Sequence, residues 1–93
     1  MEQNLNEPRP EWIDKAIAVH NVHVSRLKAN QDWRLSDTAK LLHKSVGFTC
    51  EYVKAAQWLR SHSRQLSKFD SFKDAMDFIK EKELELITME VDI

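Results

Sequence analysis

Apolar residues recur at helical spacing along most of this chain. From Glu11 they follow one another at intervals of three and four, which places them on one stripe of an α-helix. The stripe contains Ile13, Ala16, Ile17, His20, Val24 and Leu27. Pro8 and Pro10 stand just before it, where proline is tolerated at the start of a helix. The pattern predicts a first helix from Glu11 to about Asn30.

Two further apolar stripes lie close together between residues 35 and 61. Ser36 is a good N-cap, and Asp37 would place a carboxylate in the first turn, where the helix dipole favours it. The inward side of this short helix would hold Leu35, Thr38, Ala39 and Leu42. Gly47 supplies backbone freedom for a turn or for the close approach of a partner. A longer helix from about Phe48 or Thr49 to Ser61 would bury Tyr52, Val53, Ala56 and Leu59. The two stripes predict a helix-turn-helix.

The last quarter of the chain carries two different patterns. Ser71 and Asp74 resemble a capping box, and they predict a fourth helix that buries Phe72, Ala75, Met76 and Ile79. The alternating residues after it, Ile87, Met89, Val91 and Ile93, have the period of two that is typical of a strand. A single strand is not stable alone, so it would be frayed, packed on the body or paired with another chain.

Composition favours helices over a sheet, because the 93 residues include one Gly and two Pro. We therefore expect an all-α fold: a small helical domain of about four helices with a central helix-turn-helix and a C-terminal β-strand or extended tail. Residues 1–10 would form a flexible N-terminal segment, 11–82 the helical helix-turn-helix domain, and 83–93 an acidic tail with alternating apolar positions.

Several classes of function find no support in the residues. The chain lacks a nucleophile elbow, a phosphate-binding glycine loop and paired carboxylates in an apolar setting. Cys50 is the only cysteine, and the His20 and His23 pair lacks a third ligand. We expect no enzyme, no cofactor and no metal site. No apolar run approaches the roughly 20 residues that span a bilayer, so we expect no membrane partner and a cytoplasmic protein, in a bacterial cell or in the cytoplasm or nucleoid of a host.

The net charge of -1 hides two opposed blocks. Residues 34–69 hold seven Lys and Arg against two Asp and Glu, whereas residues 70–93 hold three against eight. The predicted helix-turn-helix is therefore basic by five charges, and the end of the chain is acidic by five. A basic surface of this kind favours a nucleic-acid partner.

Residues 33–80 resemble the ParB-like helix-turn-helix DNA-binding domains, particularly those of phages and mobile elements. The shared positions are Trp33, Thr38, Ala39, Leu42, Ser45, Gly47, Glu51, Ala56 and Leu59, followed by Lys73, Asp74 and Ala75. The chain departs from the group at three places. His43 stands where the first helix usually ends in Gly, Thr49 replaces an aliphatic residue, and Tyr52 replaces an acidic one.

The resemblance implies a sequence-specific double-stranded DNA-binding protein without a cofactor, such as a small phage- or plasmid-type transcriptional regulator or DNA-processing accessory factor. In a helix-turn-helix the second helix enters the major groove, and such domains usually bind as dimers. We therefore expect a homodimer, with a further protein partner at the acidic C-terminal region. The alternative is a protein–protein interaction module, an adaptor or inhibitor, that keeps the helical core but does not bind DNA.

The expected DNA contacts fall into two sets. Phosphate contacts supply affinity without sequence information, and base contacts supply specificity. The candidates for base contact are Ser45, Val46, Phe48, Cys50, Glu51 and Lys54, and those for phosphate contact are Arg34, Ser36, Lys40, Lys44, Arg60 and Arg64. Glu51 could instead cap the start of its own helix, and Cys50 could be a packing residue.

Overall fold

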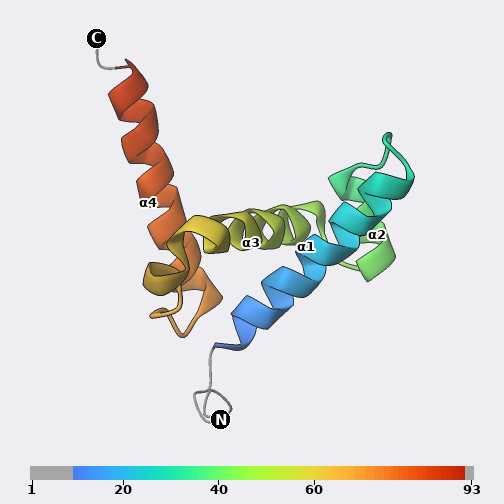
Figure 1. Cartoon of the computed structure of the whole chain (residues 1–93), viewed down its shortest axis with the longest axis horizontal. Coiled ribbons are helices and arrows are strands. Elements are labelled where there is room, and N and C mark those ends of the chain that lie inside the picture. The colour runs from blue at the N-terminus through green and yellow to red at the C-terminus, as the bar shows by residue number, and fades with distance from the viewer. Residues whose placement is uncertain (1–9, 92–93) are drawn as a thin grey trace.

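The computed structural model describes the backbone of residues 10–91 and the side chains of residues 10–87. Four α-helices follow one another in this part: α1 (Glu11–Ala29), α2 (Leu35–Leu42), α3 (Val46–Leu66) and α4 (Phe72–Val91) (Figure 1). The prediction of an all-α chain with about four helices is confirmed. The predicted flexible segment 1–10 lies outside the described residues, except for Pro10.

Side-chain caps set the starts of three helices. The carboxylate of Asp37 accepts a hydrogen bond from the Arg34 amide at 3.0 Å, so α2 begins at Leu35. Ser36 therefore lies inside the first turn, and its prediction as the N-cap is wrong because Asp37 takes the capping role. The Ser45 hydroxyl accepts from the Phe48 amide at 3.0 Å and starts α3. Ser71 accepts from the Asp74 amide at 3.1 Å, which confirms the expected start of α4.

The central helix α3 is longer than the pattern predicts. Its cap at Ser45 starts it two to three residues before Phe48 or Thr49, and it continues past Ser61 to Leu66. His62 has non-helical backbone angles, with φ -127° and ψ 33°, so the helix kinks directly after the expected end. Leu66, beyond the kink, is fully buried and explains why the chain continues toward the core.

The C-terminal strand is not found, because α4 is helical through Val91. The prediction of a β-strand or extended tail is therefore wrong for residues 83–91, and residues 92–93 lie outside the described residues. Glu, Leu, Lys and Met are good helix formers, and no Gly or Pro interrupts the sequence after Phe72. A short alternating segment continues a preceding helix more readily than it forms a strand without a partner.

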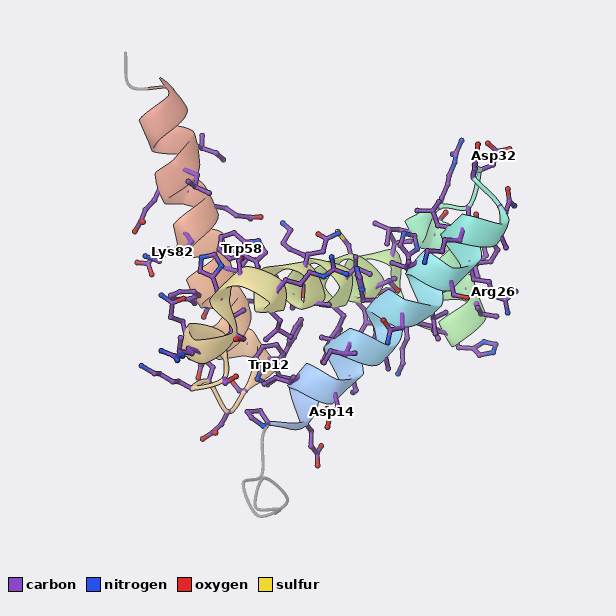
Figure 2. All side chains as sticks on the ribbon, viewed as in Figure 1. Trp12, Asp14, Arg26, Asp32, Trp58 and Lys82 are labelled. Atoms are coloured by element: carbon purple, nitrogen blue, oxygen red, sulfur yellow. The ribbon has the colours of Figure 1, made fainter. Side chains whose placement is uncertain are left out.

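The core lies where α1, α3 and α4 meet. Small residues at the crossings are fully buried: Ala16, Ala55 and Ala75. Aromatic rings fill the rest, since Tyr52 stacks on Phe72 with ring centroids 3.9 Å apart. The Trp12 indole donates to the Phe69 carbonyl at 2.8 Å and ties the start of α1 to the connection before α4 (Figure 2). The buried hydrophobic residues are Trp12, Ile13, Ala16, Val19, Ala39, Tyr52, Val53, Ala55, Ala56, Leu66, Ala75, Met76 and Ile79.

Two regions of the surface, one on α1 and one on α4, expose large apolar side chains. Ile17 and Leu27 lie on the predicted stripe of α1 but are each 38% exposed, because the buried face is centred on Trp12, Ala16 and Val19. The end of α4 extends away from the other helices (Figure 1), and Leu86 and Ile87 there are more than half exposed. The packed part of α4 therefore ends near Ile79.

Replacing two isoleucines of α4 by alanine, one at a time, should show that its packed part contributes to stability and its projecting part does not. Ile79→Ala removes a fully buried side chain and should lower the free energy of unfolding by about 2–5 kcal/mol. Ile87→Ala, at a side chain that is 55% exposed, should change it by less than about 0.5 kcal/mol. Urea unfolding followed by circular dichroism measures both. Equal losses in the two variants would contradict the packing of α4 described above.

Candidate nucleic-acid interface

A three-residue connection joins α2 to α3 through a left-handed residue. His43 has φ 59° and ψ 41°, and among the described non-glycine residues it alone has positive φ. Its amide donates to the Lys40 carbonyl at 3.1 Å, and the Lys44 amide donates to the Ala39 carbonyl at 2.9 Å. This pair of bonds is the Schellman ending of a helix, in which glycine usually takes the left-handed position. His43 occupies the place where the resemblance leads one to expect glycine.

Gly47 does not provide this turn. It lies in the first turn of α3 with negative φ, and a Cβ added to it would meet no atom within 4 Å. The expectation that Gly47 forms the turn is wrong, because Ser45 caps α3 before it. The missing side chain leaves open surface on the outside of the helix, where another molecule can approach the backbone.

A narrow strip of α3 carries side chains that the core leaves exposed. Val46 is 51% exposed, and Cys50, one turn further on, is an exposed free thiol. Gln57 continues the same strip at helical spacing and is also exposed. Sequence reasoning missed Gln57, although its distance of seven residues from Cys50 places both on one face. We call Val46, Cys50 and Gln57 the α3 strip.

The other residues expected to contact bases already have partners within the chain. The Ser45 hydroxyl caps α3. The Phe48 ring packs on Tyr52 with centroids 4.6 Å apart, and the Lys44 ammonium lies 5.2 Å from its centroid. Glu51 and Lys54 pair with charged side chains of α4. Of the six predicted residues, Val46 and Cys50 lie on the exposed α3 strip.

The predicted phosphate contacts divide into two groups along the molecule. Lys40 and Lys44 are exposed, on the last turn of α2 and in the connection that leads into α3. Arg34 is exposed directly before α2, and Ser36 is half-buried in the first turn of that helix. Arg60 and Arg64 lie 14 and 18 residues beyond Val46, a distance of about 20–27 Å at 1.5 Å per residue. The kink at His62 separates these two arginines. The fold therefore places Lys40 and Lys44 near the start of α3, Arg34 at the other end of α2, and Arg60 and Arg64 in the second half of α3.

A hydrogen-bonded cluster holds α2 against α1. The indole of Trp33 donates to the Thr38 hydroxyl at 2.6 Å, and His23 Nδ1 of α1 lies 2.8 Å from the same oxygen. Thr38 is fully buried, so both contacts satisfy a polar group that water does not reach. The Arg26 guanidinium also lies 5.8 Å from the centre of the Trp33 ring. These contacts fix the helix that supports the start of α3.

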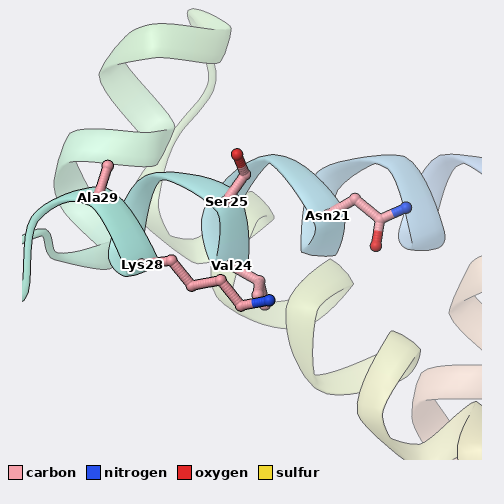
Figure 3. Close-up of a pocket in the computed structure, with 5 residues that line it drawn as sticks. All are labelled: Asn21, Val24, Ser25, Lys28 and Ala29. Atoms are coloured by element: carbon pink, nitrogen blue, oxygen red, sulfur yellow. The ribbon is translucent and has the colours of Figure 1, made fainter.

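An apolar groove of about 290 Å³ runs between α1, α2 and α3, and two residues of the α3 strip form part of its lining. Its apolar side chains are Val24, Leu27, Leu35 and Val53, and its polar ones are His20, His23, Cys50, Lys54 and Gln57. A second, shallower depression is lined by five residues of α1 alone, Asn21, Val24, Ser25, Lys28 and Ala29 (Figure 3). Because one helix supplies all of its lining, no groups converge there on a ligand.

Among the described residues, no three His, Cys, Asp or Glu side chains lie close enough together to hold a metal ion. None of the helices in residues 10–91 is both long and apolar enough to cross a bilayer.

Comparisons with models of protein families, with curated proteins and with solved structures found no match to this chain. The resemblance to the ParB-like domains stays a prediction that depends on the residues named for it.

The backbone at His43 generates a test of the connection. His43→Gly removes the steric penalty of the left-handed conformation and should raise the free energy of unfolding by about 0.5–1 kcal/mol. His43→Val places a β-branched side chain there and should lower it by about 1–2 kcal/mol. Urea midpoints compare the two variants with the parent chain. A less stable glycine variant would show that the His43 side chain makes a stabilising contact.

His20 provides a test by pH. Burial lowers its pKa below the ordinary value of 6.5, and the nearby charges of Arg60 and His23 lower it further. The unfolded chain therefore takes up this proton first as the pH falls. The contribution to stability is complete above about pH 6.5 and is lost as the pH drops through the lower pKa of the folded state.

The free energy of unfolding should thus rise with pH below about pH 6.5, and His20→Gln should flatten this rise. An NMR titration of the His20 ring measures the pKa directly. A midpoint at or above 6.5 would contradict the burial of this ring.

Proposed function

We propose that this chain binds double-stranded DNA through a helix-turn-helix formed by α2 and α3, with the α3 strip in the major groove. The observation that carries the proposal is the exposed strip of Val46, Cys50 and Gln57 next to a left-handed, three-residue connection. An α-helix fits the major groove, where base edges differ for each base pair. In this arrangement α2 supports α3 and crosses the DNA backbone.

The charge near the start of α3 supports the proposal. Lys40 and Lys44 are exposed next to the start of α3, and Arg34 is exposed at the start of α2, the helix that crosses the DNA backbone in a helix-turn-helix. The amides at the start of α3 also favour an anion, because a helix N-terminus carries partial positive charge. Gln57 and Cys50 supply an amide and a small thiol for base edges, and the open surface at Gly47 lets a base or sugar approach closely.

One such domain buries little DNA surface, so we propose that the chain acts as a homodimer on paired half-sites. Its role would be that of a sequence-specific regulator or a DNA-processing accessory factor of the ParB-like kind.

The exposed Leu86 and Ile87 on the projecting end of α4 favour a second candidate function, a protein-interaction module. In that case reversing the charge of Glu83 and Glu85 would abolish function, whereas Lys44→Glu and Lys54→Glu would leave it intact.

Binding to a pool of genomic fragments at several salt concentrations tests the proposal. Retention should fall steeply with salt, because cations that neutralise phosphates release counterions. Lys40→Gln and Lys44→Gln should each reduce the slope of log affinity against log salt by about 1. Lys28→Gln is the matched control, since Lys28 is an exposed lysine of α1, outside the proposed helix-turn-helix. No retained fragment at low salt would overturn DNA binding.

Gln57→Ala separates base contact from phosphate contact in the same assay. The variant should recover a different set of fragments, or a broader set, while the salt slope keeps the parent value, because an amide at a base edge releases no counterion. If the recovered sequences are unchanged, Gln57 does not contact bases.

A further inference from the structure

Two ion pairs connect α4 to the side of α3 next to the α3 strip. The Lys54 ammonium lies 3.2 Å from each carboxylate oxygen of Glu83. The Lys80 ammonium lies 3.6 Å from a carboxylate oxygen of Glu51. The two α3 residues are three positions apart, as are the two α4 residues, so both pairs lie on one face of each helix. The contacts have opposite polarity, because α3 contributes the cation in one pair and the anion in the other.

Other charged pairs of α4 stay within the helix. Lys82 contacts Glu85 at 3.6 Å, and Lys73 contacts Asp77 at 3.1 Å. Glu85 therefore has the same charge and helix as Glu83 but a partner on its own helix. The Lys82–Glu85 pair inside α4 therefore serves as a matched control for the two ion pairs between α3 and α4.

The part of α4 that makes these contacts is weakly packed. Ile79 is its last buried residue among the described side chains, and the helix then extends away from the body (Figure 1). Lys54 and Glu83 are 37% and 33% exposed. Ion pairs at such half-exposed positions contribute little to stability and are weakened by salt. A strong competitor for Lys54 can therefore separate them without opening the core.

We propose that α4 regulates the DNA surface of α3 by competing with phosphate for Lys54. This inference rests on the proposed function. In the free chain the Glu83 carboxylate occupies the ammonium of Lys54. A DNA phosphate is chemically similar to this carboxylate, so bound DNA takes its place. Glu83 is then an autoinhibitory residue. Lys80 acts in the opposite sense, because it neutralises Glu51, whose free carboxylate would repel the phosphates.

Breaking the two ion pairs should change the affinity for DNA in opposite directions. Glu83→Gln frees Lys54 and should tighten binding of a duplex by about 3- to 10-fold at 0.1 M salt, with the salt slope steeper by about 1. Lys80→Gln exposes the charge of Glu51 and should weaken binding by a similar factor. Fluorescence anisotropy with a labelled duplex from the retained fragment pool measures both affinities. Circular dichroism checks that each variant is folded.

Matched controls separate this mechanism from a general effect of net charge. Glu85→Gln and Lys82→Gln make the same charge changes at the pair inside α4 and should shift affinity by less than half as much on a logarithmic scale. In a Lys54→Gln background, Glu83→Gln should no longer steepen the salt slope. Hydrogen exchange in residues 80–91 of the parent chain should become faster when the duplex is added.

The outcomes distinguish this inference from the proposed function. If the parent chain binds DNA but Glu83→Gln and Glu85→Gln tighten binding equally, α4 repels DNA only through its net charge, and competition for Lys54 is overturned. If Glu83→Gln leaves affinity unchanged, the pair does not compete with phosphate. If neither the parent nor any folded variant shows salt-dependent binding, the proposed function fails, and the inference fails with it.

Discussion

The fold depends mainly on one helix, α3, because each of the other three helices packs against it. α3 packs against α1, α2 and α4, and these contacts bury Thr49, Tyr52, Val53, Ala55, Ala56 and Leu66. Tyr52 illustrates the constraint, because its ring stacks on Phe72 of α4 while the Lys15 ammonium of α1 lies 5.8 Å from its centre. Over residues 46–57, the exposed positions of α3 are Gly47 and the three residues of the α3 strip. A ligand that recognises this half of α3 must use these positions or displace a neighbouring helix.

The small size of the chain explains the kind of core that surrounds α3. A chain of 93 residues buries only about two thirds of the surface of its unfolded form, so its helices must pack closely wherever they cross. Buried alanines let the helices approach closely, and a few aromatic rings supply large apolar area at the junctions. Trp12, Tyr52 and Phe72 join three helices in one continuous contact. The projecting end of α4 has no comparable contact among its described side chains.

The local signals of the sequence predicted the helices well. The apolar stripes, Ser71 as a cap and Asp37 in the first turn of α2 depend on neighbours within four residues, which a sequence pattern contains. The alternation after Glu83 led to the wrong prediction of a strand, because a short segment of good helix formers fits both the strand period of two and the helix period of 3.6. The helix that precedes the segment decides between them. Gly47 was expected to provide a turn or the close approach of a partner, but the cap at Ser45 places it inside α3, and His43 takes the left-handed conformation of the turn.

The candidate site was predicted less completely, because its geometry depends on contacts distant in the sequence. Spacing alone placed Val46 and Cys50 on the outside of α3. It gave no indication that Glu51 and Lys54 meet residues 29 positions later in the chain. Cys50 has a practical consequence of its own. As the sole cysteine, exposed at the centre of the α3 strip, it offers one natural attachment point for a spectroscopic probe. A label there would sense whatever molecule covers this surface, without removal of any other thiol.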